Sequence, residues 1–219
     1  MTASLEQRWQ QLRADWPPGS KLLAVSKGHP AESIRTLAGF GQVDFGESRL
    51  QEALPKQELL GDLALRWHYI GRLQSNKVRG VVRAFSVIHS VDSLALAERI
   101  ARIAEEENRR PELLLQVKLR EDPNKGGWSV TALEQAWTSL QTLPSVSFVG
   151  LMTMAPQDLP LEGRLSLFEE CRALADRLGL PECSMGMSGD WRQAACAGAT
   201  WLRLGSVLFG TRLHPASAD

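Results

Sequence analysis

The sequence has little of the residue chemistry that builds disulfide frameworks or metal centres. Its 219 residues include three cysteines, which are far apart and odd in number, and no Cys-x-x-Cys or Cys/His cluster. We therefore predict neither a disulfide framework nor a zinc site. Cys171 falls in the apolar register of a helix with Phe168 and Ala175, which assigns it to the core.

An excess of one charge is also missing, as are long apolar runs. Lysine plus arginine and aspartate plus glutamate number 25 each, so the formal net charge is +0. This balance gives no general attraction to nucleic acid or to anionic membranes. The segment MTASLEQRWQQLRADW lacks the apolar core of a signal peptide, and no stretch is long enough to cross a bilayer. We expect a cytoplasmic protein with no nucleic-acid or membrane partner.

What the sequence does contain is a regular alternation of short apolar runs and longer amphipathic stretches. Ser4 with Gln7 resembles a capping box, which predicts a first helix over residues 4–16 that packs on the rest of the fold. Pro30 is expected at the first position of a later helix, and Asp92 as the cap of another. The predicted strands span residues 22–26, 43–46, 67–71, 87–91, 113–119, 147–152, 183–187 and 201–205.

Eight strands with helical connections favour parallel βα units, which close most naturally into a (β/α)₈ TIM-type barrel. A doubly wound open sheet is the rival fold, but it needs only five to seven strands and usually a glycine-rich first turn. The chain has no GxGxxG or Walker sequence. Because no linker or low-complexity segment divides it, we expect one α/β domain over residues 1–219.

Lys27 follows the first predicted strand, at the end of the barrel where active sites form. Alternation puts it on the same face as Leu23 and Val25, the face that points into the barrel. An ammonium aimed into a barrel is costly unless it is paired, deprotonated or used covalently. The alternative is a lysine that reaches out to solvent from the strand end.

Small residues and hydroxyls follow the last two predicted strands, where barrels often bind phosphate. Ser188 lies in the first of these loops, and Gly205, Ser206 and Thr211 lie in or near the second. Glycines let the backbone approach an anion, and hydroxyls add donors. The same residues would also suit tight turns and helix caps.

Arg203 lies within the last strand and stays charged with five donors, so an inward position requires an acceptor. That acceptor is either a buried carboxylate or a ligand group such as a ring nitrogen or phosphate. A lysine, a phosphate cradle and a third polar group at one barrel mouth indicate a phosphorylated cofactor that bears an aldehyde. A Schiff-base aldolase without a cofactor remains open at this point.

Several motifs together resemble one family of proteins. They are AVSKGHP, DFGESRLQE, WHYIGRLQSNK, IHSVDS, GLMTMAP and SMGMSGDWRQAACAGATWLRLGSVLFGTR, and they cover nearly the whole chain up to Arg212. In this order they are similar to the pyridoxal phosphate homeostasis protein family. The resemblance implies a fold-type III barrel like the N-terminal domain of alanine racemase, with pyridoxal 5′-phosphate (PLP) as the cofactor.

On this resemblance, Lys27 carries the cofactor as a Schiff base and Arg203 faces its pyridine nitrogen. Ser188, Gly205 and Ser206 fall where the phosphate is held. The chain departs from the family at Ser48, where an asparagine is usual, and a serine there reaches less far toward the ring. His68 and Thr211 are further candidate neighbours of the cofactor, although His68 lies within a strand and suits barrel packing equally well.

The resemblance implies a role in balancing vitamin B6 and amino-acid pools, without robust turnover. An arginine at the ring nitrogen keeps that nitrogen unprotonated, which weakens the electron sink that PLP enzymes use. The only tyrosine is Tyr69, in a predicted strand. We expect a monomer whose transient partners are apo PLP enzymes. A PLP-dependent racemase or lyase acting on small amino acids is the alternative.

Overall fold

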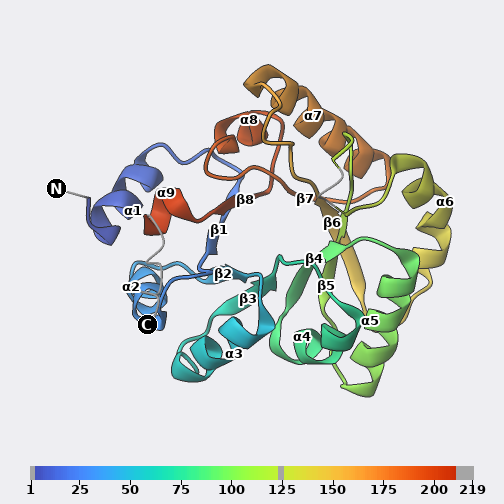
Figure 1. Cartoon of the computed structure of the whole chain (residues 1–219), viewed down its shortest axis with the longest axis horizontal. Coiled ribbons are helices and arrows are strands. Elements are labelled where there is room, and N and C mark those ends of the chain that lie inside the picture. The colour runs from blue at the N-terminus through green and yellow to red at the C-terminus, as the bar shows by residue number, and fades with distance from the viewer. Residues whose placement is uncertain (1–2, 123–125, 211–219) are drawn as a thin grey trace, which may run out of the picture.

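The computed structural model describes residues 3–122 and 126–210, whose eight strands form one closed barrel. Each strand is parallel to its neighbours, in chain order, and β1 pairs with β8 to close the ring (Figure 1). The predicted (β/α)₈ fold is confirmed. The strands are β1 (Lys21–Val25), β2 (Asp44–Glu47), β3 (Arg66–Tyr69), β4 (Val87–Val91), β5 (Glu112–Gln116), β6 (Ser147–Met152), β7 (Glu182–Ser184) and β8 (Trp201–Leu204).

Helices surround the barrel, as Figure 1 shows. No helix in the described ranges is long and apolar enough to span a membrane. The helices are α1 (Leu5–Ala14), α2 (Ala31–Gly39), α3 (Leu50–Leu59), the 3₁₀ helix η1 (Ser75–Lys77), α4 (Val78–Ala84), α5 (Leu94–Glu106), α6 (Val130–Gln141), α7 (Leu161–Arg177), α8 (Trp191–Cys196) and α9 (Ser206–Phe209).

The helix starts follow local capping chemistry. The capping box at the start of α1 is present, because the Ser4 hydroxyl accepts from the Gln7 backbone and the Gln7 side chain accepts from Ser4. The cap of α5 is Ser93, whose hydroxyl accepts from the Leu96 N–H, so the predicted Asp92 cap is wrong. Pro30 is the residue before α2 rather than its first residue.

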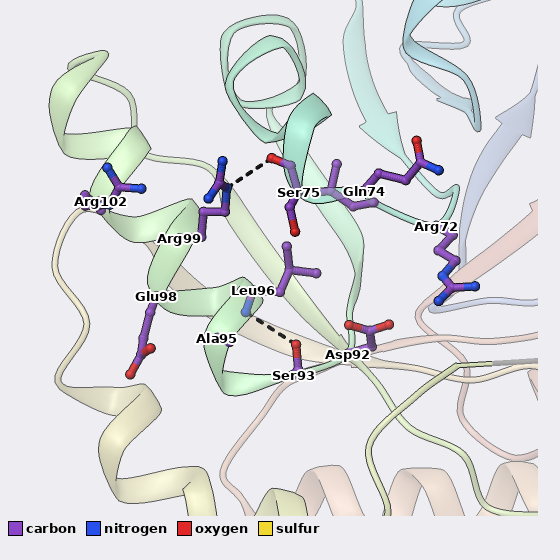
Figure 2. Close-up of a pocket in the computed structure, with 11 residues that line it drawn as sticks. Arg72, Gln74, Ser75, Asp92, Ser93, Ala95, Leu96, Glu98, Arg99 and Arg102 are labelled. Carbon is purple, nitrogen blue, oxygen red and sulfur yellow. Dashed lines mark hydrogen bonds between the residues drawn. The ribbon is translucent and has the colours of Figure 1, made fainter.

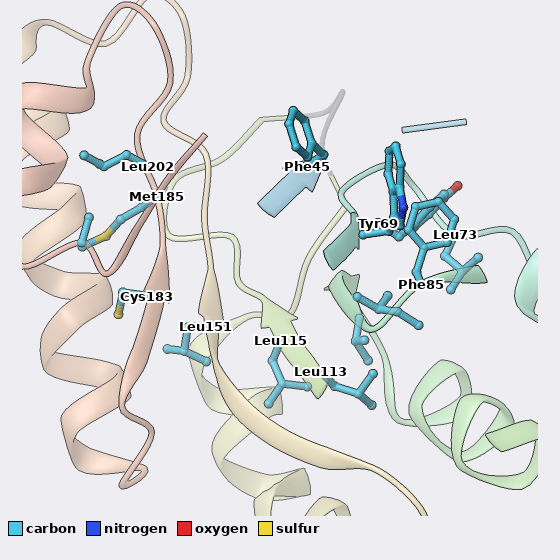
Figure 3. Packing of buried hydrophobic residues seen from close by; sticks show 14 of the residues in the cluster. Phe45, Tyr69, Leu73, Phe85, Leu113, Leu115, Leu151, Cys183, Met185 and Leu202 are labelled. Carbon is cyan, nitrogen blue, oxygen red and sulfur yellow. The ribbon is translucent and has the colours of Figure 1, made fainter. Parts of the chain in front are cut away.

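The main core lies between the outer face of the strands and the helices (Figure 3). Strand β5 shows the alternation that separates this core from the barrel interior. Leu113 and Leu115 belong to the large cluster, whereas Leu114 packs in a separate small cluster with Val87 and Met152. Because successive side chains on a strand point to opposite faces, the second cluster lies inside the barrel.

Helix α1 is hydrogen-bonded to α9, next to the pairing of β1 with β8 that closes the barrel. The Arg8 guanidinium donates from Nε to the Leu208 carbonyl at 2.7 Å and from Nη2 to the Phe209 carbonyl at 2.9 Å. Figure 1 shows the two helices side by side. Helix α1 therefore supports α9, which begins at the mouth of the barrel.

Candidate functional site

A cavity of about 640 Å³ opens at the carboxyl ends of the strands. Its lining brings together Lys27 after β1, Met152 at the end of β6, Met154 just after it, and the segments that follow β7 and β8. The five residues predicted to hold the amine, ring and phosphate of a cofactor all line it, namely Lys27, Ser188, Arg203, Gly205 and Ser206. The rule that barrels form sites at this end therefore selects one real cavity.

The loop that carries Lys27 is anchored from behind by buried polar groups. Ser26 is fully buried, and its hydroxyl donates to Glu47 Oε1 at 2.7 Å. The Lys56 ammonium donates to the Ser26 carbonyl at 2.9 Å and to the same Glu47 oxygen at 2.7 Å. The Gly28 N–H donates to Glu52, which also pairs with Lys56 at 2.7 Å. The backbone on both sides of Lys27 is thus held in place.

Burial of this network shifts the acidity of its carboxyls. Burial raises the pKa of Glu47, although the Lys56 ammonium and the Ser26 hydroxyl act in the opposite direction. Burial also acts to raise the pKa of Glu52, but hydrogen bonds from Lys56 and the Gly28 N–H outweigh it, and the net shift is downward. Lys56 therefore stabilises two carboxylates at once.

Unsatisfied backbone donors gather on one side of the cavity. Within the described ranges, the backbone N–H groups of Ser188, Gly189, Gly205 and Ser206 have no hydrogen-bond acceptor. All four residues line the cavity, and Ser188 and Ser206 add hydroxyls. Orphan amides and hydroxyls on a concave surface suit an anion with several acceptor oxygens. The donor set therefore fits a phosphate.

The loop between β7 and α8 is held in a shape that only glycine permits at one position. Gly186 has φ +83°, and a Cβ there would lie 2.5 Å from the Cβ of Ala194. Asp190 is buried and accepts from the Met187 N–H at 2.7 Å, which tightens the turn. These contacts leave the N–H groups of Ser188 and Gly189 turned away from protein acceptors.

Arg203 lies at the floor of the cavity and is only 5% exposed. Its Nη1 donates to the carbonyl and hydroxyl of Ser184 at 2.6 and 2.8 Å, and its Nη2 donates to the Thr153 carbonyl at 2.9 Å. In the described chain it has no ion pair with a carboxylate, so the buried-carboxylate alternative is not what the fold uses. Burial lowers the pKa of Arg203 to about 10, so the guanidinium stays charged at neutral pH.

Other predicted residues are not brought to the cavity. Ser48 follows β2 and its backbone lies against Gly71, where a Cβ would clash with the Ser48 carbonyl at 2.1 Å. His68 is fully buried inside the barrel, and its ring nitrogens bond to Asp44 and His89. Neither lines the cavity. Thr211 lies outside the described residues.

Sequence reasoning missed His29, which lines the cavity and stacks on Phe209 with ring centroids 4.7 Å apart. No local pattern signals this contact, because His29 and Phe209 are 180 residues apart in the sequence. It also missed the Lys56–Glu47 pair, since Lys56 stands among polar residues that suit a solvated helix.

A second cleft, of about 850 Å³, lies between the segment after β3 and helix α5 (Figure 2). The charged residues that line it are of both signs, namely Arg72, Arg99, Arg102, Asp92 and Glu98. The main polar contact across it joins the protein to itself, because Arg99 Nε donates to the Ser75 carbonyl at 3.0 Å. Among the described residues that line it there is no lysine, whereas Lys27 lines the first cavity.

Comparisons with known proteins agree with this geometry. The family model described as the alanine racemase N-terminal domain matches residues 2–213. A pyridoxal phosphate homeostasis protein from Synechocystis sp. PCC 6803 is 47% identical over 212 residues, which cover 94% of this chain and 97% of that protein.

Among solved structures, PipY of Synechococcus elongatus PCC 7942 is similar both without PLP and with PLP bound. The TM-scores are 0.92 and 0.90 at 48% and 47% identity, and the matches cover 94% of this chain and all of PipY. An alanine racemase from Clostridium difficile 630 shares only the fold, at 17% identity and a TM-score of 0.75, over 97% of this chain and 57% of that one. The chain therefore belongs to the alanine racemase N-terminal domain family and, within it, to the pyridoxal phosphate homeostasis proteins.

Proposed function

We propose that this protein holds PLP as a Schiff base on Lys27 and takes part in the homeostasis of PLP and amino acids. The observation that carries the proposal is the set of four orphan N–H groups in the cavity that also contains Lys27 and Arg203. A lysine and a phosphate cradle in one cavity match the two ends of PLP, its aldehyde and its phosphate. The names of the relatives and the PLP-bound form of PipY support the same cofactor.

In this proposal each residue has a distinct task. Ser188, Gly205 and Ser206 bind the phosphate, whose charge-assisted hydrogen bonds contribute roughly 1.5–3 kcal/mol each. Arg203 faces the pyridine nitrogen, to which a guanidinium can donate but from which it cannot accept a proton. When bound, PLP supplies an aldehyde that exchanges between amines and a ring that withdraws electrons.

We further propose that the protein is a carrier rather than an enzyme with robust turnover. In the described part of the chain, no Tyr, Asp, Glu or Cys lines the cavity, so few groups are placed to move a proton at an amino-acid substrate. Tyr69 is buried outside the site, where its hydroxyl donates to the Arg72 carbonyl. Exchange with free amines would then pass PLP to apo enzymes.

We propose that the protein performs this role in the cytoplasm, as a monomer with one domain. Closure of the barrel between β1 and β8 and the contact of α1 with α9 support a single PLP-binding unit over residues 1–219. Cys171 and Cys183 are buried and free, which suits a reducing compartment.

The alternative is a PLP-dependent racemase or lyase acting on small amino acids. One observation favours it, because His29 lines the cavity and an imidazole can act as an acid or base near neutral pH. Assays on a panel of amino acids decide between the two, since an enzyme requires steady turnover that Lys27→Ala abolishes.

The decisive experiment is an absorption spectrum of the purified protein, followed by borohydride reduction and peptide mapping. The reduced label should be on Lys27, and Lys27→Ala should be colourless. Lys21→Ala is the matched control, since Lys21 lies at the other end of β1 and pairs with Glu182. A colourless wild-type protein that PLP does not turn yellow would favour a cofactor-free lyase, and a label on another lysine would refute the assignment.

A further inference from the structure

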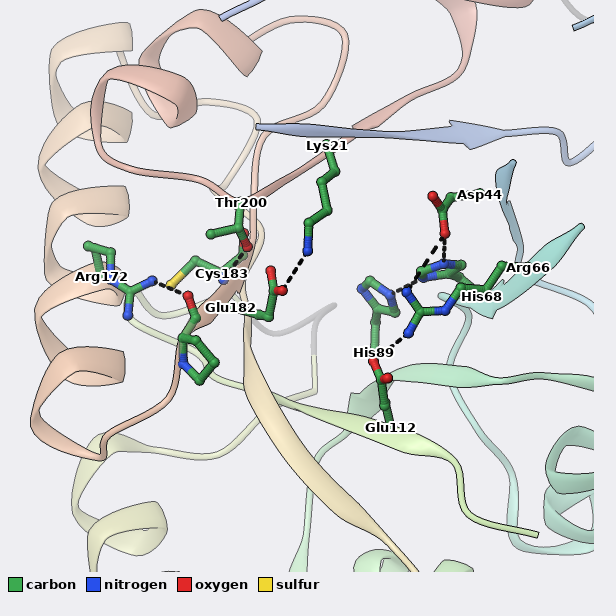
Figure 4. A network of polar contacts seen from close by, with 11 residues as sticks. Lys21, Asp44, Arg66, His68, His89, Glu112, Arg172, Glu182, Cys183 and Thr200 are labelled. Atoms are coloured by element: carbon green, nitrogen blue, oxygen red, sulfur yellow. Dashed lines mark hydrogen bonds and ion pairs between the residues drawn. The ribbon is translucent and has the colours of Figure 1, made fainter. Parts of the chain in front are cut away.

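An unbroken line of hydrogen bonds crosses the barrel interior from the cavity floor toward the opposite end. Arg203 Nη1 donates to Ser184 Oγ at 2.8 Å, and Ser184 Oγ lies 2.9 Å from His89 Nδ1. His89 Nε2 lies 2.9 Å from His68 Nδ1, and His68 Nε2 lies 2.9 Å from Asp44 Oδ1. Figure 4 shows the last part of this line, with the two imidazoles between Asp44 and the interior.

The chemistry of the two ends fixes the direction of every hydrogen in the line. Arg203 can only donate, and an ionised Asp44 can only accept. If both histidines are neutral with the hydrogen on Nε2, His68 donates to Asp44, His89 donates to His68, and Ser184 donates to His89. Each polar atom in the line then has its partner. In the opposite arrangement, with both hydrogens on Nδ1, a bare His68 Nε2 would face the Asp44 oxygen and the Ser184 hydrogen would have no acceptor in the line.

The surroundings favour the neutral forms that this arrangement requires. Burial lowers the pKa of His68, against the opposing effect of Asp44 and Glu112, and Arg66 lowers it further. Burial lowers the pKa of His89 well below its ordinary value, and His68, Arg203 and Arg66 act in the same sense. The His68 ring also packs edge-on against Trp201, which shields it from water.

The line matters for Arg203 because, within residues 3–122 and 126–210, this buried cation is hydrogen-bonded only to neutral oxygens. A serine hydroxyl accepts well when its own hydrogen is engaged elsewhere, and hydrogen bonds in series polarise one another. Asp44, with a side chain 24% exposed, is the anionic end of the series.

We propose that Asp44, His68, His89 and Ser184 form a positioning relay, which sets from the far end of the barrel how Arg203 is held toward the cofactor ring. The cofactor part of this inference rests on the proposed function. The hydrogen-bond direction does not, because it belongs to the chain without any ligand.

The first test uses the apo protein with ¹⁵N-labelled histidine. Long-range ¹H–¹⁵N spectra at neutral pH distinguish protonated from bare ring nitrogens. Both His68 and His89 should carry hydrogen on Nε2 and have a bare Nδ1. Asp44→Asn keeps an oxygen that accepts and should preserve this pattern, whereas Asp44→Ala should mix the tautomers. A wild-type His68 or His89 with hydrogen on Nδ1 would overturn the relay.

The second test uses the PLP-loaded protein. Ser184→Ala should weaken PLP binding by roughly tenfold or less, because Arg203 Nη1 loses the hydroxyl that orients it and a less ordered guanidinium meets the ring less well. Asp44→Ala should shift the absorption band of bound PLP although Asp44 does not line the cavity, and Asp44→Asn should restore most of the wild-type band. Glu182→Gln, a change at the same end of the barrel, is the control and should leave the band unchanged.

A failure of the relay proposal can be distinguished from a failure of the proposed function. A folded Asp44→Ala variant with the wild-type band and wild-type PLP affinity would refute coupling through the relay. If the borohydride label were absent from Lys27, the proposed function would fail while the apo tautomer pattern still decided the hydrogen-bond direction.

Discussion

The Glu47 carboxylate and the Lys56 ammonium lie 2.7 Å apart in the wall of the barrel, directly behind the loop that carries Lys27. The Glu47 side chain is fully buried, and its second oxygen, Oε2, has no hydrogen-bond partner in the described chain. A buried carboxylate with one unsatisfied oxygen depends strongly on its single cation. This pair is therefore a sensitive point of the fold.

Replacing Lys56 by methionine should lower the free energy of unfolding by about 3–5 kcal/mol, because Glu47 would remain buried without its cation. Urea denaturation measures the change. Adding Glu47→Gln to the same chain should recover part of the loss. Arg35→Ala removes the exposed pair with Asp62 and should hardly move the urea midpoint. Equal effects of Lys56→Met and Arg35→Ala on the free energy of unfolding would show that burial of the Lys56–Glu47 pair does not matter.

Ser188→Ala should weaken PLP binding roughly tenfold and leave binding of pyridoxal unchanged, because we propose that the lost hydroxyl contacts only the phosphate. Titrations of both ligands by absorbance give the two affinities. Thr36→Ala, on the exposed face of α2, is the control. An equal loss for both ligands would place Ser188 at the ring or the lysine instead of the phosphate.

Arg203→Lys should destabilise the protein by about 2 kcal/mol while keeping the positive charge. One ammonium cannot reproduce a planar fork that reaches both Ser184 and Thr153. Chemical denaturation of the apo protein tests this without any cofactor. The matched change Arg192→Lys, at an exposed arginine, should leave stability nearly unchanged. Wild-type stability in Arg203→Lys would mean that the fork geometry is not needed.

Stability should fall on acidification below about pH 6.5, the ordinary histidine pKa. The pKa values of His68 and His89 are lowered in the folded state, so the unfolded chain binds protons first as the pH falls. Their contribution is complete above the unfolded pKa and is lost as the pH drops toward the folded values. Each group adds a slope of up to ~1.4 kcal/mol per pH unit.

This slope is tested by measuring the free energy of unfolding between pH 5 and 8 for the wild-type protein and for His89→Leu. The variant lacks one of the two titrating groups and should be less sensitive to pH, whatever its absolute stability. Glu47, whose raised pKa acts in the opposite sense, is common to both proteins and cancels in the comparison. Parallel curves for the two proteins would contradict the assignment of the slope to the buried histidines.

The strands were predictable because apolar runs bounded by polar segments mark them clearly. Residues 87–91 and 147–152 match β4 and β6 in full. Strand β5 ends at Gln116, earlier than predicted, because Val117 makes only an isolated bridge to Trp128. Strand β7 ends at Ser184 because Gly186 takes a positive φ and the chain turns.

The lining of the cavity was predictable where a residue follows directly on a strand end, as for Lys27 and Ser206; their roles toward a cofactor stay predictions. The site was not predictable where it depends on contacts between residues that are far apart in the sequence. The pairing of Lys56 with Glu47 depends on how α3 packs, and the line from Arg203 through Ser184 to His89 crosses three strands. Local patterns in the sequence carry no information about such contacts.

The closure of the barrel between β1 and β8 also determines when the cavity that contains Lys27 can form during synthesis. Roughly 180 residues separate Lys27 from Arg203, which takes roughly 10–35 s to translate at ~5–20 residues per second. Throughout that time the nascent chain exposes Lys27 without the amides of Gly205 and Ser206 beside it. On the proposed function, capture of PLP on Lys27 therefore has to wait until residues 203–206 have been translated and β8 has paired with β1.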